Sequence, residues 1–230
     1  TDTIDKTAAA ARGIEVVAAA GANAAAVAEQ ALALMLACAK SVVPLNARVH
    51  AGQWDKATHK GVELGSRTVG LLGLGAIGRR FAASVQVLGM RVLAYDPYAQ
   101  EAPEGVTLVP LATLWRESDV LSLHCPLTDE NRELIDAEVL AQCKRGVILV
   151  NTARGGLIDE AALLQAVRSG QVMAAGLDSF AVEPIAPDHP FLGEPGFVLS
   201  PHIGGVTGDA YVNMGVAAAR NLLDVLARQP

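Results

Sequence analysis

The sequence has few aromatic residues, few cysteines and no excess of positive charge. Aromatics make up 4% of the 230 residues, whereas hydrophobic residues make up 51%. The core must therefore be built mainly from Ala, Val and Leu, as in parallel α/β sheets that are buried on both faces. The formal net charge of −6 argues against a nucleic-acid partner, because such proteins normally present a basic face.

The three cysteines, Cys38, Cys125 and Cys143, show neither metal-ligand spacing nor even pairing. This usage is typical of buried thiols in a reducing compartment, so we expect a cytoplasmic protein without a metal site. No signal peptide is visible, and the apolar run 31–39 is far too short to span a bilayer, so we expect no membrane partner. The length allows one sizeable domain, or one domain and part of a second.

The most informative pattern lies between Arg67 and Asp96. A short apolar run at 68–72 has the character of a buried strand, and glycines follow it in the spacing G-x-G-x-x-G, at Gly73, Gly75 and Gly78. The first glycine permits a tight turn, the second lets the backbone approach a pyrophosphate, and the third lets a helix pack closely on the strand. Alone, the pattern is weak evidence, because glycine-rich turns are common.

The segments after the glycines strengthen the prediction of a dinucleotide site. A helical segment at 77–88 and a second strand at 91–95 complete a βαβ unit that ends at Asp96. The helix N-terminus offers free N–H groups to phosphates, and a carboxylate at the strand tip can accept hydrogen bonds from a ribose diol. The charge of Asp96 would repel a 2′-phosphate and no arginine follows it, so we expect NAD rather than NADP. The alternative is a structural glycine turn, with Asp96 a solvated residue before Pro97.

The rest of the chain alternates predicted strands and helices. We expect strands at 120–123, 147–150, 172–177 and 197–199, and helices at 111–115, 136–143 and 160–169. Asp159 is positioned to cap the last of these helices. The alternation predicts an α/β fold with a Rossmann-type, doubly wound parallel sheet. In such sheets ligands bind beyond the carboxyl ends of the strands.

The N-terminal quarter is predicted to contain more helix than strand. We expect a helix within 1–12, a short strand at 14–18, a long helix from 24 to about 48 that is capped by Asn23, and a polar connector at 50–64. Pro44 should kink the long helix or mark a join in it. Trp54 in the connector is either a subunit contact or a local cover on the core.

Polar residues follow four of the predicted strands. They lie at 124–126, 151–156, 178 and 200–202. Arg154 can hold a carboxylate or form a surface salt bridge. His202 and His124 compete on position as proton acceptors, and each can instead be a structural histidine. A carboxylate such as Glu183 beside His202 would raise the histidine pKa and set its tautomer, but nothing local establishes that pairing.

Taken together, these motifs resemble those of the D-isomer-specific 2-hydroxyacid dehydrogenase family. The matching stretches are 73–78, 95–97, 124–128, 151–160, 176–184 and 201–205. The resemblance implies hydride transfer between NAD and C2 of a small D-2-hydroxy or 2-keto acid, with Arg154, Glu183 and His202 as a catalytic trio. It also implies cofactor contacts at Gly73, Gly75, Ala76, Ile77, Gly78, Asp96, Cys125, Pro126, Asn131, Thr152, Asp178 and Gly204.

Within this family the connector at 50–64 most resembles the D-3-phosphoglycerate dehydrogenase branch, which makes 3-phosphoglycerate a candidate substrate. The alternative function is an NAD-binding scaffold or corepressor, because such members of the family can keep the trio. A formate dehydrogenase is disfavoured, because that branch has glutamine where this chain has Glu183.

The resemblance also bears on domains and assembly. Family members carry further residues before the position that matches Thr1, so we expect this sequence to be part of a longer protein. It predicts an NAD-binding Rossmann domain at 23–205 and remnants of a flavodoxin-like substrate domain at 1–22 and 206–230. It places the helix at 24–48 and the Trp54 connector at the contact of a homodimer. The alternative is that the same apolar face packs within one subunit.

Overall fold

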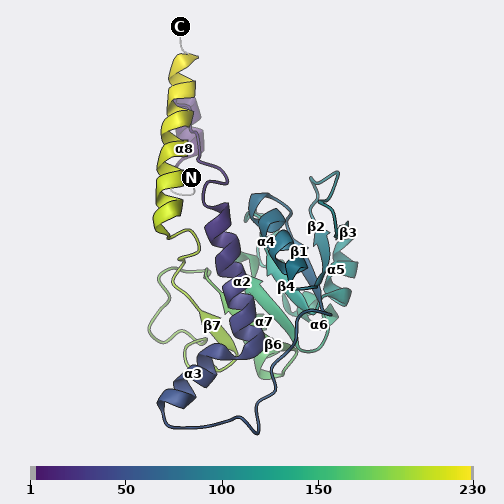
Figure 1. The fold of residues 1–230 in the computed structure, drawn as a ribbon. Helices are drawn as coiled ribbons and strands as arrows, with labels where there is room; N and C mark the ends of the chain where they lie inside the picture. Colours follow the sequence, from purple (N-terminus) through teal and green to yellow (C-terminus); the bar gives the residue numbers. More distant parts are fainter. Residues whose placement is uncertain (1–3, 229–230) are drawn as a thin grey trace.

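A seven-stranded parallel sheet forms the centre of the molecule (Figure 1), in a computed structural model that describes residues 4–228. The strand order is β3-β2-β1-β4-β5-β6-β7, and every neighbouring pair is parallel. The strands are β1 (Thr68–Leu72), β2 (Arg91–Tyr95), β3 (Val106–Leu108), β4 (Val120–Leu123), β5 (Val147–Asn151), β6 (Val172–Leu177) and β7 (Phe197–Leu199). The order reverses between β1 and β4, which confirms the predicted Rossmann-type sheet.

Helices cover both faces of this sheet. The helices of the described residues are α1 (Lys6–Ala11), α2 (Ala24–Lys40), α3 (Val42–His50), α4 (Ala76–Val87), α5 (Leu111–Glu117), α6 (Ala137–Gln142), α7 (Glu160–Arg168) and α8 (Gly208–Ala227), with a 3-10 turn, η1 (Gly155–Leu157). One apolar cluster joins the sheet to α2 and α4, and a second joins it to α5, α6 and α7. Leu71 belongs to the first cluster and Leu72 to the second, because successive strand residues point to opposite faces.

The predicted strand at 14–18 was wrong. These residues carry no regular structure and several are exposed. They lie beside α8, where Asn221 donates a hydrogen bond to the Ala18 carbonyl at 2.8 Å, so they have no sheet edge to join. The predicted helix within 1–12 forms only as α1, and Thr1 to Thr3 lie outside the described residues.

The predicted long helix at 24–48 is two helices. It stops at Lys40, Ser41 adopts a left-handed conformation with φ 51°, and α3 leaves at a bend of 63°. Pro44 lies inside the first turn of α3 rather than at the bend. The reason is steric, because a proline ring clashes with the carbonyl four residues earlier, here that of Lys40. Asn23 is at the predicted N-cap position, but its side chain makes no capping hydrogen bond.

Most of the other elements agree with the sequence to within two residues. The cap at Asp159 is confirmed, because one of its carboxylate oxygens accepts the N–H groups of Ala161 and Ala162, both at 3.0 Å. No pattern in the sequence indicated β3, which lies at the edge of the sheet. It has three residues, of which only Val106 is buried, so it shows no alternation long enough to detect.

Candidate active site

The carboxyl ends of β4, β5, β6 and β7 bring their polar residues to one rim, as the sequence predicted. A hollow of about 670 Å³ lies there, a size typical of small-ligand sites. It is lined from the strand exits and α4 by Ile77, His124, Cys125, Pro126, Thr152, Arg154, Asp178, His202 and Gly204. Asn23 and Val27 of the α2 region and Tyr211 and Met214 of α8 also line it. Sequence reasoning missed these four, because no local pattern shows which helix passes over the rim.

The turn between β1 and α4 has the close packing that the glycine spacing predicts. Gly73 has φ 99°, and a Cβ there would lie 2.8 Å from backbone atoms of His124 and Cys125. At Gly78 a Cβ would lie 2.3 Å from the Gly73 carbonyl oxygen, whereas beside Gly75 there is open space. A ligand can therefore approach the backbone at Gly75. The first turn of α4 has no side-chain cap, which leaves its N–H groups for an anion.

Asp96 stands at the end of β2 and holds the glycine turn. Its carboxylate accepts the N–H of Leu74 at 2.8 Å on one oxygen and that of Tyr98 at 2.9 Å on the other. Each carboxylate oxygen has a second lone pair, so Asp96 can also accept hydrogen bonds from a ligand.

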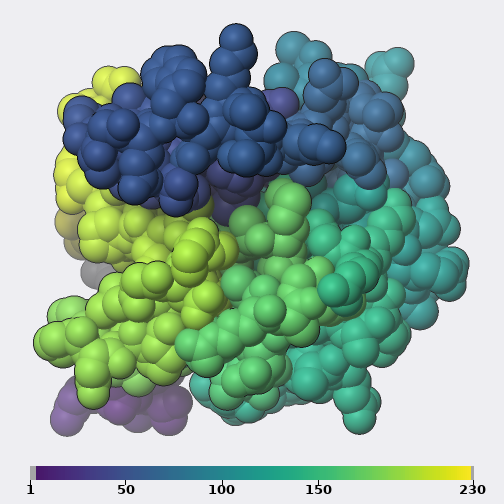
Figure 2. Space-filling model, turned by 90° about the horizontal axis from the view of Figure 1, so that it is seen from below, coloured from purple at the N-terminus to yellow at the C-terminus, as the bar shows by residue number. Residues whose placement is uncertain are grey.

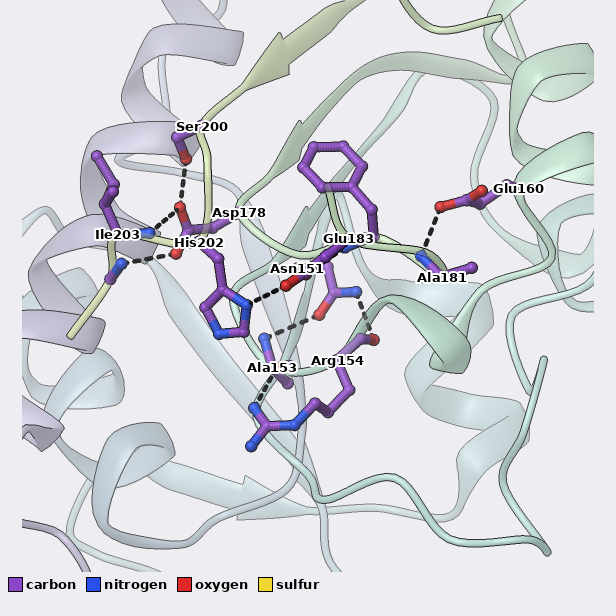
Figure 3. A network of polar contacts seen from close by, with 12 residues as sticks. Asn151, Ala153, Arg154, Glu160, Asp178, Ala181, Glu183, Ser200, His202 and Ile203 are labelled. Atoms are coloured by element: carbon purple, nitrogen blue, oxygen red, sulfur yellow. Dashed lines mark hydrogen bonds and ion pairs between the residues drawn. The ribbon is translucent and has the colours of Figure 1, made fainter. Parts of the chain in front are cut away.

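The structure brings His202 and Glu183 together, although 19 residues separate them (Figure 3). Nδ1 of His202 lies 2.7 Å from Oε2 of Glu183. A carboxylate at Nδ1 fixes the proton on that nitrogen, which leaves a lone pair on Nε2. The other oxygen of Glu183 accepts the N–H of Phe180 at 2.9 Å. His202 has a left-handed φ of 54°, which costs about 1–2 kcal/mol.

The pKa of Glu183 lies below its ordinary value. Burial acts to raise the pKa, but the hydrogen bonds from His202 and Phe180 and the charges of His202 and Arg154 outweigh it. Glu183 is therefore ionised at neutral pH and can stabilise a positive charge on His202.

Asp178 fixes the loop that carries His202. The side chain is almost fully buried, and its carboxylate accepts the Ser200 hydroxyl at 2.5 Å and the N–H groups of Ile203 at 2.9 Å and Gly204 at 2.7 Å. Gln30 of α2 donates to the Ser200 oxygen at 3.0 Å. The loop is thus tied both to β6 and to the helix that crosses the rim.

Arg154 is placed by a buried asparagine at the end of β5 (Figure 3). The side chain of Asn151 accepts the Ala153 N–H at 3.0 Å and donates to the Arg154 carbonyl at 2.9 Å. Nη1 of Arg154 donates to the Ala153 carbonyl at 2.7 Å. Arg154 lines the same hollow as His202.

His124, the competing candidate, has a different environment. Its ring packs on Phe81 with centroids 5.0 Å apart, and Nε2 lies 3.0 Å from the Ser122 hydroxyl. Burial lowers the pKa of His124 to about 4, so the ring is neutral at physiological pH. Of the two histidines, His202 is the one with a carboxylate partner, so the geometry favours His202 as the proton acceptor.

Thr152, Cys125 and Asn131 were all expected to contact the cofactor, but they differ in position and in the polar group that each presents. Thr152 lines the hollow with a buried hydroxyl that has no hydrogen-bond partner within the described chain. Cys125 also lines it, and burial raises the pKa of its thiol to about 11. Asn131 does not line the hollow. Its amide accepts the Thr128 N–H and donates to the Pro126 carbonyl, so it closes the loop after β4.

Comparison with known proteins identifies the family. The model of the NAD-binding domain of D-isomer-specific 2-hydroxyacid dehydrogenases matches residues 32–204. The chain belongs to this family. A hydroxypyruvate reductase from Thermotoga maritima is 44% identical over 227 residues, which are 98% of this chain and 74% of that protein. A D-3-phosphoglycerate dehydrogenase from Archaeoglobus fulgidus is 42% identical in an alignment of 232 positions that covers all of this chain but 44% of that protein.

Solved structures of D-2-hydroxyacid dehydrogenases share the fold. A D-2-hydroxyisocaproate dehydrogenase matches with a TM-score of 0.92 and 34% identity over 98% of this chain and 73% of that one. A glyoxylate reductase from Paecilomyes thermophila matches with a TM-score of 0.89 and 34% identity over 99% of this chain and 70% of that one. This chain therefore spans about three quarters of such proteins, and less than half of the phosphoglycerate dehydrogenase above.

The relatives named above are oxidoreductases that act on CH–OH donors, the matching family model is that of an NAD-binding domain, and the hollow of this chain fits NAD. Three features suit a dinucleotide: the open space beside Gly75, the free N–H groups at the start of α4, and the Thr152 hydroxyl, which has no partner within the described chain. Among residues 4–228 no cluster of His, Cys, Asp and Glu side chains could hold a metal ion. In the same range no single helix is long and apolar enough to cross a membrane, although α2 and α3 reach the threshold as a bent pair.

Proposed function

We propose that this chain provides the NAD site and the catalytic trio of an enzyme that interconverts a small D-2-hydroxy acid and its 2-keto acid. The His202–Glu183 pair carries the proposal, because it gives a histidine with a fixed tautomer at the hollow that Arg154 also lines. The glycine turn, Asp96, Thr152 and the residues after β4 would hold the cofactor.

In the oxidation direction, the guanidinium of Arg154 binds the substrate carboxylate in a bidentate manner. Nε2 of His202 accepts the proton of the C2 hydroxyl as C2 gives up its hydride. NAD, held by the glycine turn and Thr152, would supply the hydride acceptor. Glu183 stabilises the imidazolium that results, and in reduction His202 returns the proton to the C2 oxygen. Proton transfer of this kind contributes roughly 10²–10⁴-fold to the rate.

The substrate proposal is 3-phosphoglycerate, with hydroxypyruvate as the nearest competitor. Both follow from relatives that are 42–44% identical to this chain, and the connector at 50–64 favours the first. We also propose the domain division expected from the sequence, with 23–205 as the NAD-binding domain and 1–22 and 206–230 as parts of a substrate domain. In support, α8 projects from the sheet (Figure 1) and exposes Leu222, Leu223 and Leu226.

We propose further that the protein is a homodimer that works in the cytoplasm. α3 and the connector form a band on the molecular surface, dark blue in Figure 2. Val42, Val43 and Val49 of α3 are about half exposed, and Trp54 is 78% exposed. An apolar strip of this kind fits a second copy of the chain. The three cysteines are unpaired, which supports a reducing compartment.

The test of the enzymatic proposal is the variant His202→Asn. The wild type should oxidise NADH in the presence of a 2-keto acid from a panel that includes 3-phosphohydroxypyruvate and hydroxypyruvate. In the variant kcat should fall by about 10²–10⁴-fold, because no other group takes the proton. The NADH dissociation constant, measured by fluorescence titration, should stay unchanged.

Glu138→Gln is the control, because Glu138 is an exposed residue in the first turn of α6, away from the hollow and from the proposed dimer contact. Full turnover by His202→Asn would refute the assigned role. Tight NADH binding by the wild type without turnover of any keto acid would favour the scaffold function instead.

A further inference from the structure

We propose that Glu160 and His189 form a second carboxylate–imidazole pair, which positions Glu183 and through it His202. The inference rests on the proposed function, because it assigns a positioning role within the same site. Neither residue lines the hollow of about 670 Å³, so both would act through the loop between β6 and β7.

Two carboxylates hold two consecutive amides of that loop. Oε1 of Glu160 accepts the N–H of Ala181 at 2.9 Å (Figure 3), and Oε1 of Glu183 accepts the N–H of Phe180 at 2.9 Å. The Glu183 bond is internal to the loop, since donor and acceptor are three residues apart. Glu160 lies in the first turn of α7, so its hydrogen bond ties the loop to a helix that packs on the sheet.

Gly155 also packs closely against the peptide between Phe180 and Ala181. A Cβ on Gly155 would lie 1.8 Å from the carbonyl carbon of Phe180 and 2.3 Å from the nitrogen of Ala181. Glycine at this position therefore allows the turn after Arg154 to touch the loop that carries Glu183. This contact fixes the two loops against each other only while the Phe180–Ala181 peptide stays in place. The hydrogen bond from Ala181 to Glu160 holds that peptide.

His189 holds the carboxylate of Glu160. Its Nδ1 accepts the N–H of Phe191 at 3.3 Å, so the proton of the neutral ring is on Nε2, which lies 3.3 Å from Oε2 of Glu160. The ring packs edge-on against Phe191, with centroids 4.7 Å apart, and Phe191 stacks on Phe197 of β7 at 4.1 Å. The side chains of His189 and Glu160 are 16% and 24% exposed, so the pair is mostly shielded from water.

The distance between Glu183 and His202 depends on this support. Glu183 lies in a loop that has no regular structure between Leu177 and Phe197, whereas His202 is fixed separately by Asp178. A displacement of the loop by about 1 Å would lengthen the bond to Nδ1, and misplacement of that size can cost ~10²-fold in rate. Glu160 and His189 therefore keep Glu183 within hydrogen-bonding distance of His202.

A double-mutant cycle tests the inference, using Glu160→Ala, Glu183→Gln and the double variant. The first readout is the pKa of His202, taken from imidazole NMR in the absence of substrate. Glu183 contacts His202 directly, and Arg154 and Asp178 line the same hollow, so the measured pKa is sensitive to where these charges lie. We expect Glu160→Ala to lower it toward the value in Glu183→Gln, and the double variant to match Glu183→Gln alone.

The second readout is kinetic. Glu160→Ala should lower kcat about 10-fold or more while the NADH dissociation constant stays the same, and it should add little to Glu183→Gln. Glu160→Gln keeps an acceptor for the Ala181 N–H and should retain most of the activity. Glu138→Ala is the matched control, because Glu138 is an exposed residue in the first turn of α6.

An unchanged His202 pKa in Glu160→Ala, or independent effects in the double variant, would overturn the inference. If Glu160→Ala does not fold, His189→Leu removes the same support and should shift the His202 pKa in the same direction, and no shift there would overturn it equally. The NMR readout needs no turnover. A coupled pKa in an inactive wild type would thus keep the positioning pair and reject the proposed reaction.

Discussion

At the residue scale, carboxylates that accept backbone N–H groups hold the loops around the hollow. Asp96 fixes the glycine turn, Asp178 fixes the His202 loop, and Glu183 and Glu160 fix the loop between β6 and β7. Hydrogen bonds to an ionised acceptor are roughly twice as strong as neutral ones. Three loops with little regular structure can therefore present their side chains in defined positions.

His124 gives a prediction for the pH dependence of stability. Its pKa is about 4 in the folded protein and about 6.5 in an unfolded chain. Between these values the unfolded state binds a proton that the folded state does not, so stability falls as the pH drops from about 6.5 to about 4. In His124→Gln this part of the loss should be absent. Urea unfolding at pH 7 and pH 5 would measure it, and an equal loss in both proteins would contradict the prediction.

The sequence could predict which residues form the site, but not all of their relations. Arg154, Glu183 and His202 were expected from motifs, and the strand exits correctly predicted a common rim. Spacing alone could not choose between His202 and His124, because the choice depends on a carboxylate 19 residues away. The pair of Glu160 and His189 was missed for the same reason, since its members lie 29 residues apart and His189 is outside the motifs.

At the scale of elements, strands and helices were predicted correctly where the sequence pattern is long and the residues that form it are buried. The strands of the sheet interior were found because each is a run of buried residues, as in β1 and β5. The segment 14–18 was also predicted as a strand, but it contains Glu15 and has no neighbouring strand. The break at Ser41 was misplaced by three residues, because a proline acts on the turn before it.

The packing of α2 on β6 depends on one glycine. A Cβ on Gly176 would lie 2.8 Å from Cβ of Leu34 and 3.3 Å from Sγ of Cys38. Gly176→Ala should push α2 from the sheet and lower the free energy of unfolding by about 1–3 kcal/mol. Gly215→Ala is the matched control. It lies within α8 with open space beside it, so it should raise that free energy by up to about 1 kcal/mol. Chemical denaturation would compare the two, and equal effects would refute the packing argument.

At the scale of the whole molecule, the exposed strip on α3 is expected to join two copies. Val49→Glu puts a charge into that strip and should convert the dimer to a monomer, because an unpaired charge is costly to bury. Val87→Glu is the matched control, since Val87 is 87% exposed at the end of α4. Light scattering after size exclusion would give the masses. A wild type that is monomeric, or a Val49→Glu variant that stays dimeric, would contradict the proposed interface.

The position of α2 has a consequence for how the chain is synthesised. The helix packs against β5, β6 and β7, and β6 begins about 130 residues after α2 ends. At ~5–20 residues per second, the ribosome needs on the order of ten seconds to deliver these strands. During that time Leu34, which is buried against Gly176 of β6 in the finished protein, lacks the strand that covers it. A nascent chain stalled before β6 should therefore be a substrate for chaperones that hold apolar helices.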